Sequence, residues 1–342
     1  MSLSPEGTSR ETKAGQLARR FLGYAIVLVC LVWVFHDVHA ERLFREIGQI
    51  QWEWILLAIF LDTFSYFAQG WRWEFLLRPT GKISPLKTTQ AVYAGLFTNE
   101  IVPLRAGELV RAYLVSRWLP CDFLAVIPSM VVERLFDGIW LALGIGLTVL
   151  LVRLTGNLVQ AAEILGAAVL AATGLFIYLV IRKERTIAVN PTQKPSKCRP
   201  FHLLSSLIEN LAGGIRNIGV SRYLFMAFFA SSLILVFQIF SFWLVMWSYG
   251  LRLSLWIGAA VLLIEHLGTT IPNAPSNLGT YQFFVVVGLT LFGVDKTTAT
   301  GFSVVVFIVL TVPLWAIGLL AVGRSGMTFK EIRGEITRLM KR

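Results

Sequence analysis

The amino-acid sequence predicts an all-α membrane protein: a polytopic helix bundle with about six full spans and two oppositely oriented re-entrant or broken helical hairpins. Hydrophobic residues make up 56% of the 342 residues and charged residues only 15%, and the mean hydropathy is +0.68. Soluble domains average about 45–50% apolar and about 25% charged residues. The composition therefore excludes a soluble globular fold and also a disordered chain. Long uncharged runs and an uneven distribution of Lys and Arg support the same fold class.

Runs without Asp, Glu, Lys or Arg give the positions of the spanning helices. A helix needs about 20 apolar residues to cross the hydrocarbon core, and four runs reach or approach this length: 223–251, 267–294, 297–323 and 164–181. Full spans are predicted at residues 18–36, 52–71, 125–152, 158–181, 222–249 and 298–323. Tryptophans at both ends of the second span are predicted to form aromatic belts: Trp52, Trp54, Trp71 and Trp73.

The distribution of Lys and Arg predicts the orientation in the membrane. Four segments, 1–20, 72–87, 182–222 and 324–342, contain 22 of the 31 basic residues. The segments predicted to face outward, 36–51, 153–157, 250–253 and 294–297, contain only five. Because cytoplasmic loops carry an excess of basic residues, we expect a multi-pass protein of the cell (inner or cytoplasmic) membrane with both termini in the cytoplasm.

The same segments divide the chain into regions. Residues 1–17 are interpreted as a cytoplasmic tail, 18–323 as the transmembrane domain and 324–342 as a basic cytoplasmic tail. Within the domain, 182–221 is predicted to be a Pro-rich cytoplasmic linker followed by a surface helix. The first apolar run is expected to remain as a signal anchor, because the polar segment before it is long. The net charge of +11 predicts contacts with anionic membrane lipids and not with nucleic acid.

Two apolar stretches, 88–117 and 253–294, each must begin and end on one side of the membrane to keep this charge pattern. The first is predicted to be a re-entrant dip followed by a charged half-helix, whereas the second could be a broken hairpin or two full spans. Their breaks share a pattern, Pro103-x-x-x-Gly107 and Pro275-x-x-x-Gly279. Interrupted hydrophobic segments in corresponding places are typical of inverted-repeat transporters, with the site at the breaks.

Two groups of polar and charged residues fall at membrane depth, where a charge costs at least about 2.5–3.5 kcal/mol. They are Asn99, Glu100, Arg105, Glu108 and Arg111, and Glu133, Arg134 and Asp137. One interpretation is that the groups pair with one another and lock helices together. The other is that one or two arginines bind an anionic headgroup, for which the planar guanidinium is well suited. Both could hold together.

Three further ionisable residues are candidates for proton coupling: Asp62, Glu265 and His266. A hydrogen-bonded interior role is the alternative for each. The sequence contains no recognised hydrolase, nucleotide-binding or metalloprotease motif, and its three cysteines are far apart. We therefore expect no enzyme activity, no cofactor and no metal site.

Three motifs carry a family resemblance. The first reads Asn-x-x-x-Pro-x-Arg-x-Gly-Glu at 99–108, the second Glu-Arg-x-x-Asp at 133–137, and the third Pro-Ser-Asn-Leu-Gly-Thr-Tyr-Gln at 275–282. In these motifs, and over about residues 15–325, the chain resembles the flippase-like transmembrane domain of lysylphosphatidylglycerol synthetases and their stand-alone relatives. In many relatives the third motif has a glycine pair where Ser276 and Asn277 stand here, and an acid in place of Gln282.

The resemblance implies a bundle with re-entrant helices that moves phospholipids or polyprenyl-linked lipids between leaflets. Lysyl transfer is not expected, because only about 19 residues follow the last predicted span. The leading hypothesis is thus a non-enzymatic lipid flippase, and the alternative is a non-transporting partner of an envelope glycosyltransferase or lipid-modifying enzyme. The predicted substrate-binding residues are Asn99, Arg105, Glu108, Arg111, Glu133, Arg134, Asp137, Pro275, Asn277, Gly279 and Gln282.

Overall fold

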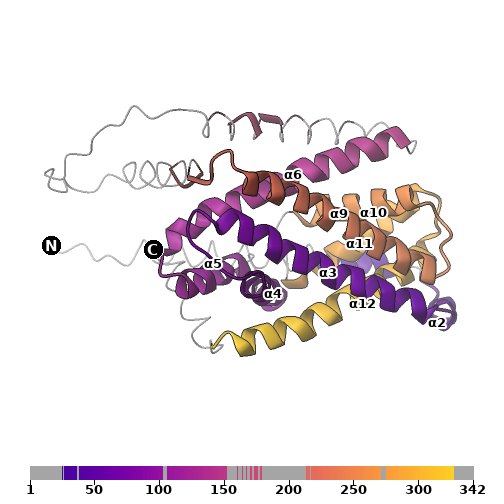
Figure 1. Cartoon of the computed structure of the whole chain (residues 1–342). Coiled ribbons are helices and arrows are strands. Elements are labelled where there is room, and N and C mark those ends of the chain that lie inside the picture. The colour runs from indigo at the N-terminus through magenta and orange to yellow at the C-terminus, as the bar shows by residue number, and fades with distance from the viewer. Residues whose placement is uncertain are drawn as a thin grey trace, which may run out of the picture. The chain divides into compact units, whose positions relative to one another are not determined.

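The computed structural model describes residues 27–36, 38–102, 106–151, 217–270 and 275–326, together with residue 25, residues 213–215 and some residues between 160 and 178. All regular secondary structure in these ranges is helical, so the predicted all-α polytopic membrane bundle is confirmed (Figure 1). The chain forms two compact units. Unit 1 comprises residues 1–61, 95–108 and 239–319, and unit 2 comprises residues 62–94, 109–238 and 320–342.

The helices with defined bounds are α2 (Ala40–Ile47), α3 (Trp52–Leu77), α4 (Pro85–Ile101), α5 (Gly107–Trp118), α6 (Phe123–Leu151), α9 (Arg222–Ser248), α10 (Leu255–Thr269), the 3-10 turn η1 (Pro275–Asn277), α11 (Thr280–Leu291) and α12 (Lys296–Arg324). Pro85 occupies the first position of α4, where its missing N–H leaves no hydrogen bond unmade. Ser254 caps α10, since its hydroxyl accepts a hydrogen bond from the backbone N–H of Ile257.

Among the described residues, three helices are long and apolar enough to cross a membrane. They are α6, α9 and α12, with 29, 27 and 29 residues, and their bounds lie within two residues of the predicted spans. Spans of this length extend about 40 Å at 1.5 Å per residue, which exceeds the ~30 Å hydrocarbon core. The predicted span 158–181 and the first part of 18–36 lie largely outside the described residues.

Helix α3 differs from the predicted span 52–71 because it continues to Leu77. No Gly or Pro interrupts the chain between Gly70 and Pro79, so nothing local stops the helix at Trp71. The extension brings Arg72 and Glu74 into the helix, where both are buried. The assignment of Arg72 to a cytoplasmic loop was therefore wrong.

The two interrupted stretches form pairs of short helices. Helices α4 and α5 have 17 and 12 residues, and α10 and α11 have 15 and 12. At 1.5 Å per residue none of the four reaches the ~30 Å of the hydrocarbon core. The second stretch is thus a broken hairpin and not two full spans. The breaks lie at the predicted motifs, and the second helix of each pair begins at or directly after the motif's glycine, at Gly107 and at Thr280.

Each unit has its own packed interior. In unit 1, Phe242 of α9 meets Phe302 of α12 edge to face, with ring centroids 5.4 Å apart. In unit 2, Trp140 of α6 donates to the carbonyl of Phe228 of α9 at 2.9 Å. Because apolar side chains gain little from burial in lipid-surrounded bundles, such close packing and inter-helix hydrogen bonds carry much of the association.

Candidate functional site

Unit 2 contains a buried cluster of arginines and carboxylates built by helices α3, α5 and α6. Arg111 of α5 donates two parallel hydrogen bonds to Glu133 of α6, at 3.0 and 2.9 Å. Arg72 of α3 reaches the same carboxylate, with its Nη2 3.2 Å from Glu133 Oε1. The three side chains are only 1–3% exposed. Glu133 therefore joins three helices through one carboxylate, which offsets the cost of burying two guanidinium groups.

Asp137 lies one helical turn after Glu133 and extends the cluster toward the surface. It pairs with Arg72, which also donates to Ser231 of α9 at 3.0 Å. Arg134 lies 3.3 Å from Asp137 and 3.6 Å from Glu133, and its side chain is 47% exposed. The i,i+3 pair of Arg134 and Asp137 matches the spacing read from the sequence. Among the described residues of this cluster, three arginines share two carboxylates.

Arg72 and its neighbour Trp73 are members of the cluster that the sequence did not reveal. Trp73 was expected in an aromatic belt, but it is fully buried, and its indole N–H donates to Ser129 at 3.0 Å. The guanidinium of Arg111 lies over the Trp73 ring, 4.3 Å from the centroid, in a cation–π contact. The sequence contained one indication of this. No Gly or Pro follows Trp71 until Pro79, so the helix could be expected to continue through Arg72 and Trp73.

The cluster is not fully satisfied by protein groups. Within the described part of the chain, the Nε atoms of Arg72 and Arg111 are buried and have no hydrogen-bond partner. An unsatisfied buried donor costs about 1–3 kcal/mol, more when the group is charged. These two N–H groups are therefore places where an internal water or a ligand oxygen would be stabilised.

Unit 1 brings the two helix breaks into contact. The Ser276 hydroxyl, in the break before α11, donates to the backbone carbonyl of Glu100 near the end of α4 at 3.1 Å. The Glu100 carboxylate accepts a hydrogen bond from the Trp315 indole of α12 at 3.1 Å. The Asn99 side chain accepts one from the backbone N–H of Gly107 at 2.7 Å. Two segments 176 residues apart thus meet at the point where each loses its helical structure.

The backbone of the second break is strained at two residues. Ser276 and Asn277 have φ of 59° and 48°, in the left-handed region that side chains with a Cβ rarely adopt. Gly279 has φ of 84°, and its N–H donates to the side-chain oxygen of Gln282 at 2.7 Å. Strain of this kind costs about 1–3 kcal/mol per residue and persists where the surrounding structure requires it. The strained residues, Ser276 and Asn277, stand where the family resemblance implies a glycine pair.

Gln282 is 4% exposed and uses its carbonyl oxygen as the cap of α11. A carboxylate could accept the same hydrogen bond, and it would be favoured by the dipole at the helix N-terminus. We predict that Gln282→Leu lowers the free energy of unfolding by about 1 kcal/mol, whereas Gln282→Glu loses less. Thermal melts of the purified variants in detergent would measure both. Equal losses in the two variants would contradict the capping role.

The proposed proton-coupling residues lie in different units. Asp62 of α3 belongs to unit 2 and is 6% exposed. Glu265 and His266 belong to α10 of unit 1, and the Glu265 carboxylate lies 2.6 Å from His266 Nδ1. Glu265 is buried, while the His266 side chain is 33% exposed. Glu265 and His266 are thus an acid and an imidazole in direct contact.

The predicted site residues thus fall into two groups. Unit 2 brings together Arg111, Glu133, Arg134 and Asp137, and adds Arg72. Unit 1 holds Asn99, Glu108, Asn277, Gly279 and Gln282 at or beside the breaks. Arg105 lies outside the described residues, and nothing is described of the Pro275 side chain. Among the described residues there is no group of three or more His, Cys, Asp or Glu side chains that could hold a metal ion.

Comparison with known proteins agrees with this architecture. The model of the family "Lysylphosphatidylglycerol synthase TM region" matches residues 20–318. A UPF0104 membrane protein of Methanothermobacter thermautotrophicus is 21% identical over 331 residues, which cover 93% of this chain and 97% of the relative. A UPF0104 membrane protein of Methanocaldococcus jannaschii is 26% identical over 265 residues, 72% of this chain and 77% of the relative.

Proposed function

Because the chain belongs to the lysylphosphatidylglycerol synthase transmembrane family, we propose that it is a non-enzymatic lipid translocase. Its substrate class is a phosphate-bearing lipid, either a phospholipid or a polyprenyl-linked lipid. The headgroup passes the polar cluster of unit 2 while its hydrocarbon tails stay in the bilayer. The residues that would contact the phosphate are Arg134 first, and then the inner arginines of the cluster.

The proposal rests on the difference in solvent exposure among the three arginines of the cluster. Arg72 and Arg111 are buried and hold Glu133 by close contacts, while Arg134 is 47% exposed and lies farther from the same carboxylate, at 3.6 Å. A phosphate can compete for Arg134 because Glu133 and Asp137, two carboxylates beside it, also pair with buried arginines. Guanidinium binds phosphate through two parallel N–H donors, and it does not lose its proton.

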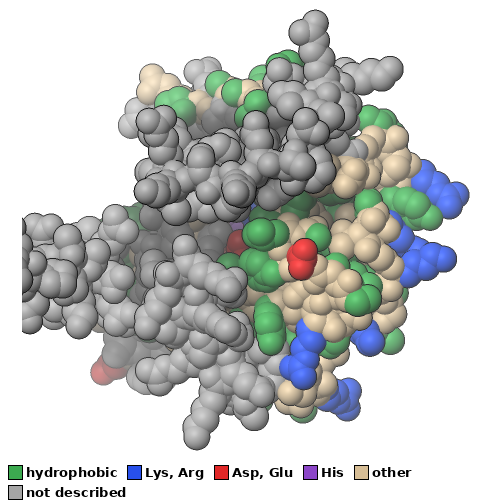
Figure 2. Space-filling model, turned by 90° about the vertical axis from the view of Figure 1, so that its left-hand side faces the viewer, with side chains coloured by type: hydrophobic (Ala, Val, Ile, Leu, Met, Phe, Trp, Pro, Cys, Tyr) green, Lys and Arg blue, Asp and Glu red, His purple; other side chains and the backbone are tan. Residues whose placement is uncertain are grey.

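The proposal includes a location in the inner or cytoplasmic membrane with both termini in the cytoplasm. It is supported by the concentration of basic residues in 1–20, 78–87, 182–222 and 324–342. Figure 2 shows basic side chains projecting from the described part of one face, beside hydrophobic ones. Anionic lipids would be attracted to such a surface before they enter the cluster.

A lipid-scrambling assay tests the function. The full chain is reconstituted into liposomes that contain fluorescent phosphatidylglycerol, and dithionite measures how much label reaches the outer leaflet. We predict that Arg134→Gln lowers the rate at least 10-fold, while Arg134→Lys retains part of it. Because the Arg134 ion pairs are half exposed, the loss of stability should stay within about 1 kcal/mol.

Arg117→Gln is the matched control, because Arg117 is an exposed arginine at the end of α5, outside the cluster. It should scramble lipid at the wild-type rate. Wild-type rates in a folded Arg134→Gln variant would overturn the role of the cluster. A wild-type protein that moves no lipid but purifies in a fixed ratio with an envelope glycosyltransferase or lipid-modifying enzyme would favour the assembly-partner function.

A further inference from the structure

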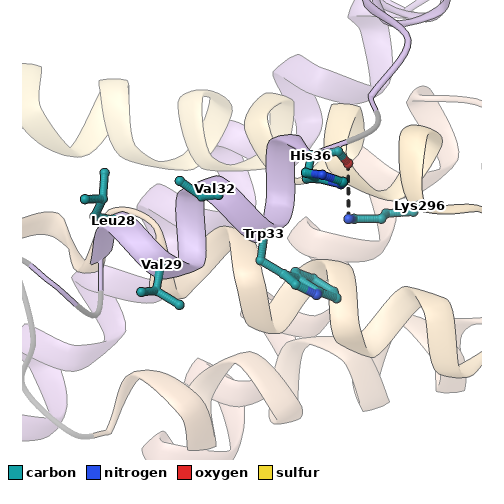
Figure 3. Close-up of a pocket in the computed structure, with 6 residues that line it drawn as sticks. All are labelled: Leu28, Val29, Val32, Trp33, His36 and Lys296. Atoms are coloured by element: carbon teal, nitrogen blue, oxygen red, sulfur yellow. Dashed lines mark hydrogen bonds between the residues drawn. The ribbon is translucent and has the colours of Figure 1, made fainter.

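A further feature of unit 1 lies beside the first described helical segment, residues 27–35. It is an open groove of about 460 Å³ lined by Leu28, Val29, Val32, Trp33, His36 and Lys296 (Figure 3). The first five come from the helical segment 27–35 and the residue after it, and Lys296 is the first residue of α12. From Leu28 to His36 the apolar face extends about 12 Å along the helix axis.

The helical segment is firmly attached to the core of unit 1. Val34 is fully buried, and its carbonyl accepts a hydrogen bond from Thr300 of α12 at 3.1 Å. Leu28, Val29 and Val32 point the other way and are 58–67% exposed. The groove wall is therefore a fixed apolar surface on the outside of the unit.

A cation is held at one end of this apolar surface. The Lys296 amine donates to the His36 carbonyl at 3.2 Å and lies 4.6 Å from the centroid of the Trp33 ring. The Trp33 ring is itself held edge to face against Phe283, with centroids 4.9 Å apart. The ammonium has three N–H donors, and the carbonyl takes one. The other two can be directed to an anion.

Two carboxylates close to the start of α12 form hydrogen bonds with groups other than Lys296. Asp295 accepts a hydrogen bond from the backbone N–H of Thr298 at 3.2 Å, as the cap of α12. The two oxygens of Glu46 accept from Tyr249 and from the Thr298 hydroxyl, at 2.8 and 2.9 Å. Among the residues that the structure describes, Lys296 forms no ion pair with a carboxylate; Asp37, which follows His36, lies outside them.

We infer that this groove binds one glycerophospholipid with an anionic headgroup: an acyl chain lies along Leu28, Val29 and Val32, and the phosphate contacts Lys296. The combination of an apolar channel with a fixed ammonium beside a tryptophan matches the boundary between hydrocarbon and headgroups. The charge distribution predicts that this end of unit 1 faces outward. The site does not depend on the transport function, because the lipid need not move.

Native mass spectrometry of the delipidated full chain in detergent tests the site. The probes are phosphatidylglycerol, phosphatidylcholine and inorganic phosphate at matched concentrations. The wild type should bind one more phosphatidylglycerol molecule than the Lys296→Gln variant does. The apparent affinity of the variant for that lipid should be at least 10-fold lower. Lys296→Arg should keep the lipid, and Val32→Trp should displace it by filling the groove without changing the charge.

Arg252→Gln is the matched control, because Arg252 is also an exposed cation over a tryptophan of unit 1, 4.1 Å from the Trp247 centroid, but it is not part of the groove. It should bind lipid as the wild type does. Equal binding by wild type and Lys296→Gln would overturn the site, as would equal binding of phosphatidylcholine and phosphatidylglycerol. Inorganic phosphate that binds as tightly as the lipid would show an anion site without a lipid.

Discussion

A Glu133→Gln variant is expected to lose about 3–5 kcal/mol of folding free energy, which is enough to lower its yield and its melting temperature sharply. Glu133 is the carboxylate that Arg72 and Arg111 share in the interior of unit 2, at 3.2 and 2.9 Å. Glutamine keeps one acceptor oxygen but removes the negative charge. Arg72 would then depend on Asp137, whose side chain is 39% exposed, and Arg111 would lose the charge of the carboxylate that it contacts.

The measurement is a thermal melt of the purified protein in detergent, followed by tryptophan fluorescence. Glu74→Gln provides a matched control, because Glu74 is also a buried glutamate and has one basic partner at 2.5 Å. That partner, Arg78, is 33% exposed, so it can turn to water when its carboxylate is removed. The loss should be clearly smaller than for Glu133→Gln. A Glu133→Gln melt equal to that of the control would contradict the central role of this carboxylate.

The expected loss of stability at Glu133 distinguishes the residues of the cluster that stabilise the fold from the residue that binds a ligand. The inner residues Arg72, Arg111 and Glu133 are buried on all sides, and their pairing resembles the ion-pair lock considered from the sequence. Arg134 is the member that a headgroup can reach without breaking this lock. A cluster can therefore hold helices together through its inner pairs and still present one arginine to a ligand, so the two interpretations are compatible.

Helix breaks were the most predictable part of the fold. Proline removes a donor and glycine relaxes the backbone, so Pro103-x-x-x-Gly107 and Pro275-x-x-x-Gly279 located both interruptions. The contact between the breaks was less accessible to sequence reasoning. Among the described residues it includes the hydrogen bond from Ser276 to Glu100, and no local spacing encodes a partner 176 residues away.

Arg72 shows why the site was only partly predicted. The prediction assumed that a basic residue near the end of an apolar run lies in a loop, and this assumption is correct on average. It fails where the helix continues and the cation turns inward. The partners of Arg72 on α6 and α9 come from distant parts of the chain, so its burial could be recognised only once the tertiary structure was known.

The Gly107→Ala substitution should have a comparably large effect, for a steric reason. A Cβ at this position would lie 1.8 Å from the backbone oxygen of Gly95 and 2.7 Å from the Asn99 side-chain oxygen. A backbone atom cannot move aside as a side chain does, so α4 and the start of α5 would have to separate. The separation would also break the 2.7 Å hydrogen bond between Gly107 and Asn99. We expect a loss of about 3–5 kcal/mol.

Gly146→Ala is the control that isolates this contact, because an added Cβ at Gly146 of α6 meets nothing within 4 Å. Alanine is the better helix former by about 1 kcal/mol, so this variant should match or exceed the wild-type melting temperature. Fluorescence-detected size-exclusion chromatography after heating would compare the two variants. Since the glycine of the first motif lies where one helix ends and the next begins, a Gly107→Ala protein as stable as Gly146→Ala would mean that the close approach of these helices is not required.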